Sequence, residues 1–185
     1  MGDLYVALIH HPVVDRNGAI VTSAITSLDI HDIARAARTY EVRNVFVVHP
    51  VEEQRNFAAS VVDHWKFDFG RAHDSRRREA LERVRIVTDL DGAIAEAEKL
   101  SGSRPRIIHT SARTAGGTSY GELRAMMEFA DAPPMLLLLG TGFGMAKSVA
   151  DRADIILAPV LGPGDYNHLS VRSAAGIILD RLRGH

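Results

Sequence analysis

The sequence contains no cysteine among its 185 residues. Disulfide bonds, cysteine–zinc sites and thiol catalysis are therefore excluded, which fits a reducing compartment. The longest apolar run, residues 133–139, is far shorter than the roughly 20 residues that a membrane-spanning helix needs. The N-terminus also lacks the basic region and long apolar core of a signal peptide. We therefore expect a cytoplasmic protein without a membrane partner.

The chain also carries little net charge, −1 at pH 7 from 22 basic and 23 acidic residues. This balance weakens any case for strong nonspecific binding to nucleic acid, which needs clustered positive charge. One segment, residues 67–85, does concentrate basic side chains: Arg71, His73, Arg76, Arg77, Arg78, Arg83 and Arg85. It is either a solvated loop and helix face or an RNA-contacting patch. The length predicts a single domain, 1–185.

Strand-like and helical patterns alternate along the chain. Short apolar runs predict strands at residues 4–10, 42–48, 83–87, 106–109, 135–139 and 155–159. Apolar residues at helical spacing predict a helix over residues 57–65 and further helices that begin near residues 27, 89, 120, 144 and 167. Ser27 or Asp29 is available to cap the helix near residue 27, and Asp89 the helix near residue 89. Residues 12–26 are irregular, with a turn at Asn17-Gly18. This order predicts an α/β fold, a mainly parallel sheet with helices on both faces.

Glycine-rich loops follow two of the most apolar strands. Residues 135–139 run into Gly140-Thr-Gly142-Phe-Gly144, and residues 155–159 are followed by Gly162 and Gly164. Open α/β sheets bind small ligands beyond the carboxyl ends of their strands. Glycine also lets backbone amides and carbonyls approach a ligand closely. The two loops therefore predict a ligand site, although the first loop alone is more typical of a simple turn than of a ligand loop.

Read together, these loops resemble the closing motifs of the SPOUT family, S-adenosylmethionine-dependent RNA methyltransferases with a deep trefoil knot. Residues 139–144 resemble the family's glycine-rich loop, and Pro159 with Gly162 resembles the exit of its next strand. Residues 166–171, Tyr-Asn-His-Leu-Ser-Val, resemble the opening of its last helix. The chain looks especially similar to a bacterial group of stand-alone SPOUT proteins.

Two upstream segments resemble the same family in the correct order. Residues 109–113, His-Thr-Ser-Ala-Arg, resemble a Thr-Ser-Ala-Arg loop that several members carry after the first strand of the knot. Residues 29–40 resemble the first motif and place Arg35 at the motif arginine. Four motifs in order are far more specific than one glycine-rich loop. The resemblance implies a knot over about residues 105–185.

The resemblance further implies S-adenosylmethionine as cofactor, with S-adenosylhomocysteine as product, an RNA substrate (tRNA or rRNA), a homodimer and no metal. Cofactor-binding positions carried over from the motifs are Thr110, Ser111, Leu139, Gly140, Thr141, Gly142, Gly144, Leu157, Pro159, Gly162, Gly164, Asn167, His168, Leu169 and Ser170. Together, the three loops should meet in one pocket.

Three residues are candidates for catalysis. Arg35 could orient a phosphate or polarise the methyl acceptor, and in the family this arginine commonly acts across a dimer interface. His168 could serve as a base because imidazole titrates near neutrality. Asp165 could act as an acid or base, or simply cap the last helix.

The motifs also depart from the family pattern. The glutamate common in the glycine-rich loop of the ribose-methylating branch is absent from residues 140–144, and His168 replaces an asparagine near the last helix. Ribose and base methylation therefore both stay open. Two other functions remain as alternatives: a regulatory module that binds S-adenosylmethionine without catalysis, and an unknotted nucleotide or phosphate binder with its loop at a helix N-terminus.

Overall fold

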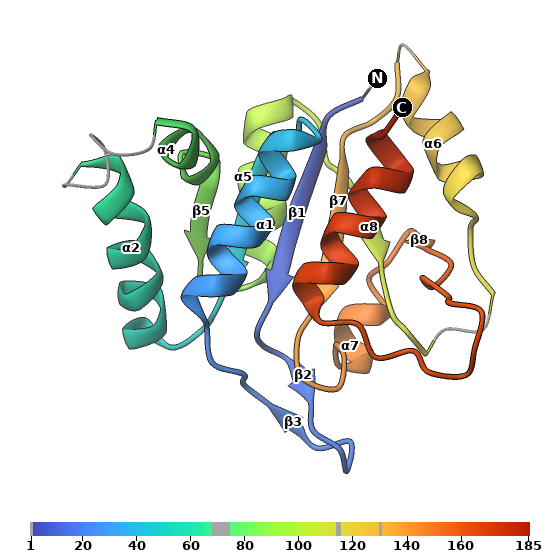
Figure 1. The fold of residues 1–185 in the computed structure, drawn as a ribbon, viewed down its shortest axis with the longest axis horizontal. Helices are drawn as coiled ribbons and strands as arrows, with labels where there is room; N and C mark the ends of the chain where they lie inside the picture. Colours follow the sequence, from blue (N-terminus) through green and yellow to red (C-terminus); the bar gives the residue numbers. More distant parts are fainter. Residues whose placement is uncertain (1, 68–74, 114–115, 130) are drawn as a thin grey trace.

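A parallel sheet forms the centre of the molecule (Figure 1). The computed structural model describes residues 2–67, 75–113, 116–129 and 131–185. Within them, six strands lie in the order β5-β4-β1-β7-β6-β8, and every neighbouring pair is parallel. They are β1 (Leu4–Ile9), β4 (Asn44–Val48), β5 (Val84–Val87), β6 (Arg106–His109), β7 (Met135–Gly140) and β8 (Ile155–Ile156). The mainly parallel sheet predicted from the sequence is confirmed.

Helices cover both faces of the sheet, as predicted (Figure 1). One face packs against α1 (Ser27–Thr39), α2 (Glu52–Lys66), α4 (Ser75–Leu81), α6 (Tyr120–Glu128) and α8 (Val171–Arg183). The other packs against α5 (Leu90–Ser101) and α7 (Lys147–Ala150). None of the helices that the structure describes is long and apolar enough to cross a membrane.

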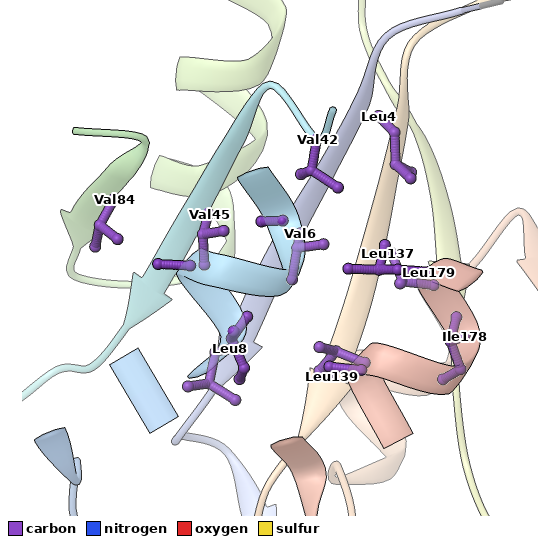
Figure 2. Close-up of a cluster of buried hydrophobic side chains, with 14 of the residues drawn as sticks. Leu4, Val6, Leu8, Val42, Val45, Val84, Leu137, Leu139, Ile178 and Leu179 are labelled. Atoms are coloured by element: carbon purple, nitrogen blue, oxygen red, sulfur yellow. The ribbon is translucent and has the colours of Figure 1, made fainter. Parts of the chain in front are cut away.

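The central strand β1 shows why the apolar runs become buried strands. Its side chains alternate, so that Leu4, Val6 and Leu8 pack on the α1 and α8 side while Tyr5, Ala7 and Ile9 pack on the α5 side. All six are fully buried. Figure 2 shows the first set meeting Leu137 and Leu139 of β7 and Leu179 of α8. A strand covered on both faces has no polar face, so its sequence reads as a continuous hydrophobic run.

The predicted irregular segment at residues 12–26 holds a small antiparallel pair, β2 (Val13–Val14) and β3 (Ile20–Val21). Gly18 turns the chain between them with φ of +83°. The cap of α1 also differs from prediction, because the Thr26 side chain, rather than that of Ser27 or Asp29, accepts the hydrogen bond from the Asp29 amide. The predicted cap of α5 by Asp89 is confirmed.

Three elements near the C-terminus are shorter than predicted. Strand β8 ends at Ile156 because the amide of Ala158 turns to the carbonyl of Thr118 instead of continuing along β6. Helix α7 begins at Lys147 rather than near residue 144, since the preceding loop bonds to β2. Helix α8 begins at Val171 rather than residue 167, because the Ser170 side chain caps the Ser173 amide. Asp165 is therefore not the helix cap.

Candidate active site

A cavity of about 630 Å³ opens beyond the carboxyl ends of β6 and β7. The loops that follow β6, β7 and β8 lie in the lower part of the view in Figure 1. Four segments form most of the cavity wall: Thr110–Arg113, Leu139–Phe143, Ala158–Val160 and Asn167–Arg172. Ser23, Ala24, Asp29, Tyr120, Ala174 and Ile178 complete it. Loops from distant parts of the chain therefore converge on one hollow.

Most residues predicted from the sequence as cofactor ligands line this cavity. They are Thr110, Ser111, Leu139, Gly140, Thr141, Gly142, Pro159, Asn167, His168, Leu169 and Ser170. Gly144, Leu157, Gly162 and Gly164 do not line it, although they belong to the same loops. Of the predicted catalytic residues, His168 lines the cavity, whereas Asp165 and Arg35 do not. Arg35 is exposed on α1 and borders a separate groove with Arg38 of α1 and with Arg76 and Arg77 of α4.

The loop after β7 needs glycine at two positions. A Cβ on Gly140 would lie 2.8 Å from Met145 Cγ and 3.1 Å from its amide nitrogen. Gly142 has φ of +60°, a conformation that L side chains rarely adopt. The amide of Phe143 donates to the Val14 carbonyl at 3.1 Å, and the Val14 amide donates to Gly144 at 2.9 Å. The loop is therefore fixed against β2 and presents its backbone to the cavity.

The other two loops are bonded to each other. The Asn167 side chain donates from Nδ2 to the carbonyl of Ala112 at 3.0 Å, which joins the segment before α8 to the loop after β6. The amide of Thr118 donates to the Ile156 carbonyl at 2.8 Å, so the same β6 loop also pairs with β8. Thr110 Oγ1 donates to the Leu138 carbonyl at 2.7 Å. These bonds hold the segments of the cavity wall together.

A buried ion pair at the cavity was not found from the sequence. Asp29, only 7% exposed, accepts from Arg172 Nη1 at 2.8 Å and from Thr26 Oγ1 at 2.6 Å. Arg172 Nε also lies 3.5 Å from Asp32. The pair joins the start of α1 to the start of α8, and both members line the cavity. A signal did exist, because Asp29 stands at the first motif position and Arg172 follows the last one.

Comparisons with known proteins show the family to which the chain belongs. A family model described as SAM-dependent RNA methyltransferase matches residues 3–184, nearly the whole chain. The chain belongs to this family of S-adenosylmethionine-dependent RNA methyltransferases. Its cofactor is S-adenosylmethionine, as predicted from the motifs. Solved structures described as SpoU and TrmH-family methyltransferases share its fold.

Relatives and solved structures agree with this assignment. A tRNA (guanine-N(1)-)-methyltransferase of Oleidesulfovibrio alaskensis is 41% identical over 182 residues, which are 98% of this chain and 42% of that protein. The methyltransferase chain thus spans less than half the length of this relative. A probable methyltransferase of Bordetella pertussis shares the fold with a TM-score of 0.65, 15% identity and coverage of 98% and 93% of the two chains. The SpoU methyltransferase AviRb of Streptomyces viridochromogenes, in complex with AdoMet, has a TM-score of 0.54, 17% identity and coverage of 97% and 56%.

The cavity of this methyltransferase fits its cofactor chemically. Its volume of about 630 Å³ falls within the usual range for small-molecule sites, about 300–1,000 Å³. The backbone around Gly140 and Gly142 offers amides and carbonyls without side chains in the way. The apolar side chains of Leu139, Val160 and Ile178 line the cavity, where the adenine ring of the cofactor can pack against them. Among the described residues, no group of three or more metal-binding side chains is found.

Proposed function

We propose that the methyltransferase holds S-adenosylmethionine in this cavity and transfers its methyl group to RNA. The observation that carries the proposal is the convergence of the loops after β6, β7 and β8 on one hollow, with Gly140 leaving the backbone open to a ligand. The cofactor supplies an electrophilic methyl group on a sulfonium. The residues at the cavity contribute alignment of the two reactants and exclusion of water.

The three predicted catalytic residues differ in whether they line the cavity. His168 lines the cavity, so we propose it as the group that takes the proton from the methyl acceptor. Arg35 lies outside the cavity of its own chain, on the exposed side of α1. We propose that it acts in the cavity of a second copy, in a homodimer. Asp165 is exposed and does not line the cavity, and we keep it as the second candidate acid or base.

A trefoil knot over about residues 105–185 is part of the proposal. Strand β7 pairs between β1 and β6, and β8 pairs on the outer side of β6. The chain must then return from that edge to place α8 against α1 and α6. On the way, Asn167 bonds to Ala112 of the loop after β6. This return path supports a threaded chain, which is rare among proteins.

We propose tRNA as the substrate class and the cytoplasm as the location. Support for tRNA comes from the name of the Oleidesulfovibrio alaskensis relative, which describes the activity of a protein more than twice as long as the matched segment. Arg76, Arg77 and Arg78 of α4 belong to the basic segment considered as an RNA-contacting patch. Arg71 and His73 of that segment lie outside the described residues.

Two measurements test the proposed function. Calorimetry with S-adenosylhomocysteine should show binding, and a matched titration with ATP and inorganic phosphate should show none. Tritiated S-adenosylmethionine, incubated with the protein and total RNA from cells that lack the gene, should label the tRNA fraction. Cofactor binding without label in any RNA fraction would favour the regulatory module, and binding of phosphate instead would favour the nucleotide binder.

A further inference from the structure

Two buried histidines stand behind the cavity, at the carboxyl ends of adjacent strands. His10 follows β1 and is 0% exposed, and His49 follows β4 and is 1% exposed. Their ring centroids are 5.7 Å apart. Burial, followed by the neighbouring His49, lowers the pKa of His10 to about 4. Burial also lowers the pKa of His49. Both rings are therefore neutral near pH 7, and each carries a single N–H.

Hydrogen bonds determine which nitrogen of His49 carries that proton. The amide of Val51 donates to His49 Nδ1 at 3.1 Å, so Nδ1 must present a lone pair. The proton then resides on Nε2, which lies 3.1 Å from the carbonyl of Ser23 and donates to it. His49 therefore fixes the backbone of Ser23.

The same reasoning fixes His10 through a chain of hydroxyls. Thr141 Oγ1 donates its only proton to the carbonyl of Ile9 at 2.9 Å. The bond between Ser23 Oγ and Thr141 Oγ1, at 2.5 Å, must therefore use the proton of Ser23. Ser23 then has no proton left for its 2.9 Å bond to His10 Nδ1, so His10 is the donor. The direction of every bond in this chain is determined.

Ser23 is consequently held at its amide, its carbonyl and its hydroxyl. Its amide donates to the His10 carbonyl at 2.9 Å, in addition to the bonds from His10 and His49. A hydroxyl has one proton and two lone pairs. The proton of Ser23 is used by Thr141 and one lone pair by His10, which leaves one lone pair. Since Ser23 lines the cavity, it can accept a hydrogen bond there and cannot donate one.

This arrangement excludes proton removal by His10. Its Nδ1 already carries a proton, so Ser23 cannot pass another proton to it. Its Nε2 is buried without a hydrogen-bond partner among the described residues. At the other end, the chain stops at the carbonyl of Ile9, which cannot hold a proton near neutral pH. The histidines therefore position Ser23 and do not act as bases.

We propose that Ser23 binds the methyl-accepting nucleotide of the RNA by accepting a hydrogen bond from an O–H or N–H group of that nucleotide other than the group that gives its proton to His168. The inference rests on the proposed function. Ser23 and Asp29 form the N-terminal wall of the cavity, whereas the predicted cofactor ligands begin at Thr110. This hydrogen bond holds the nucleotide so that its attacking atom is aligned with the methyl group, as an in-line transfer requires. His10 and His49 are positioning residues for this contact.

Four variants test the contact in the full chain: Ser23→Ala, His10→Leu, His10→Asn and, as a matched control, Ser60→Ala on the exposed side of α2. Ser23→Ala should lower kcat/KM for tritium transfer into total RNA by about tenfold, the size expected for one hydrogen bond. Its affinity for S-adenosylhomocysteine should stay within about twofold of the original. His10→Leu should cause a similar loss. His10→Asn, whose amide can donate in place of Nδ1, should restore most of the transfer, while Ser60→Ala should change nothing.

Each result separates this contact from the proposed function. Full transfer by Ser23→Ala, in a protein that binds the cofactor and methylates RNA, would overturn the inference alone. Equal losses of cofactor affinity and transfer would also overturn it, by assigning Ser23 to the cofactor. A shifted pH profile of kcat/KM in His10→Asn would also overturn the inference, because it would indicate that His10 takes up a proton during the reaction. Failure of the unaltered protein to bind S-adenosylhomocysteine would refute the proposed function, and the inference with it.

Discussion

The loop after β7 and the loop after β8 both line the same cavity, yet they are built differently. Residues 141–146 are tied to the segment after β1, through bonds from Phe143 to Val14 and from Ala146 to Pro12. Residues 157–170 leave large side chains in solvent, with Leu161 at 64% and Tyr166 at 78% exposed. Asn167 ties this second loop to Ala112.

The difference indicates how the cofactor site is formed. A loop fixed by its own backbone bonds is already in its binding conformation, so it loses little entropy when a ligand arrives. A loop with exposed apolar side chains gains buried surface only when a ligand or another surface covers it. The β7 loop is therefore the preformed side of the cavity, and we expect the β8 loop to close over the cofactor.

Acidification should produce the largest effect, because it adds a proton to a buried histidine, His10, which is linked to the preformed side through Ser23 and Thr141. The folded pKa of His10 is about 4, below its ordinary value of 6.5. Between pH 6.5 and pH 4 the unfolded chain binds a proton on this histidine that the folded protein does not bind. The free energy of unfolding is therefore highest above pH 6.5 and decreases as the pH falls toward 4. The difference of roughly 2.5 pH units corresponds to about 3 kcal/mol.

Urea unfolding of the original protein and His10→Asn at pH 7 and pH 4 checks this expectation. The unaltered protein should lose about 3 kcal/mol more than the variant between the two values. Other histidines, such as His49 and His109, also have pKa values lowered by burial and contribute to both proteins equally. The same pH dependence in both proteins would show that folding does not lower the pKa of His10.

Gly140→Ala should distort the preformed side directly. The added Cβ would lie 2.8 Å from Met145 Cγ, so the loop or Met145 must move. We expect a loss of about 2 kcal/mol in unfolding free energy, typical of overpacking, and clearly weaker binding of S-adenosylhomocysteine. Gly121→Ala is the control, since a Cβ there would meet no atom within 4 Å. Thermal unfolding and calorimetry that show no difference between the two variants would refute a preformed loop.

The sequence predicted the strands better than the loops, for a physical reason. Buried strands such as β1 and β7 are specified by local hydrophobicity, because every side chain in them is covered. The residue at which a helix or strand begins or ends depends on the hydrogen-bond partner of each backbone amide and carbonyl there. Strand β8 stops where Ala158 bonds to Thr118, and α8 starts where Ser170 caps Ser173. Hydrophobic periodicity predicts neither of these two hydrogen bonds.

The site was predictable to the extent that it follows three of the motifs that resemble the SPOUT family: residues 109–113, residues 139–144 and residues 166–171. Those motifs placed the loops at residues 110, 140 and 167 around the cavity. The pairing of Ser23 with His10 and His49 was not predictable, because it depends on β1 lying beside β4. The register aligns Ile9 with Val48, which brings the two following histidines together. The sequence did contain a signal, a histidine directly after each of these two strands.

Asn167→Ala should have a smaller effect, and on binding rather than folding. The change removes the hydrogen bond from Nδ2 to the Ala112 carbonyl, which holds the β8 loop near the β6 loop. We expect the affinity for S-adenosylhomocysteine to fall about fivefold, or about 1 kcal/mol, with unchanged thermal unfolding. Asn167→Asp also lacks an N–H donor and should behave alike. A clear drop in melting temperature for Asn167→Ala would instead place this bond in the folded framework.

Leu161→Ser should have the smallest effect on the unfolding free energy. It also tests directly whether the β8 loop is open before the cofactor binds. The side chain is 64% exposed, so its removal should change the unfolding free energy by less than about 0.5 kcal/mol. Leu137→Ala, at a fully buried position of β7, should cost about 2–5 kcal/mol. If the β8 loop closes over the cofactor and buries Leu161, calorimetry should still show a loss of affinity of about threefold for Leu161→Ser. Unchanged affinity would mean that Leu161 stays in solvent in the bound state, and that closure of this loop does not include its tip.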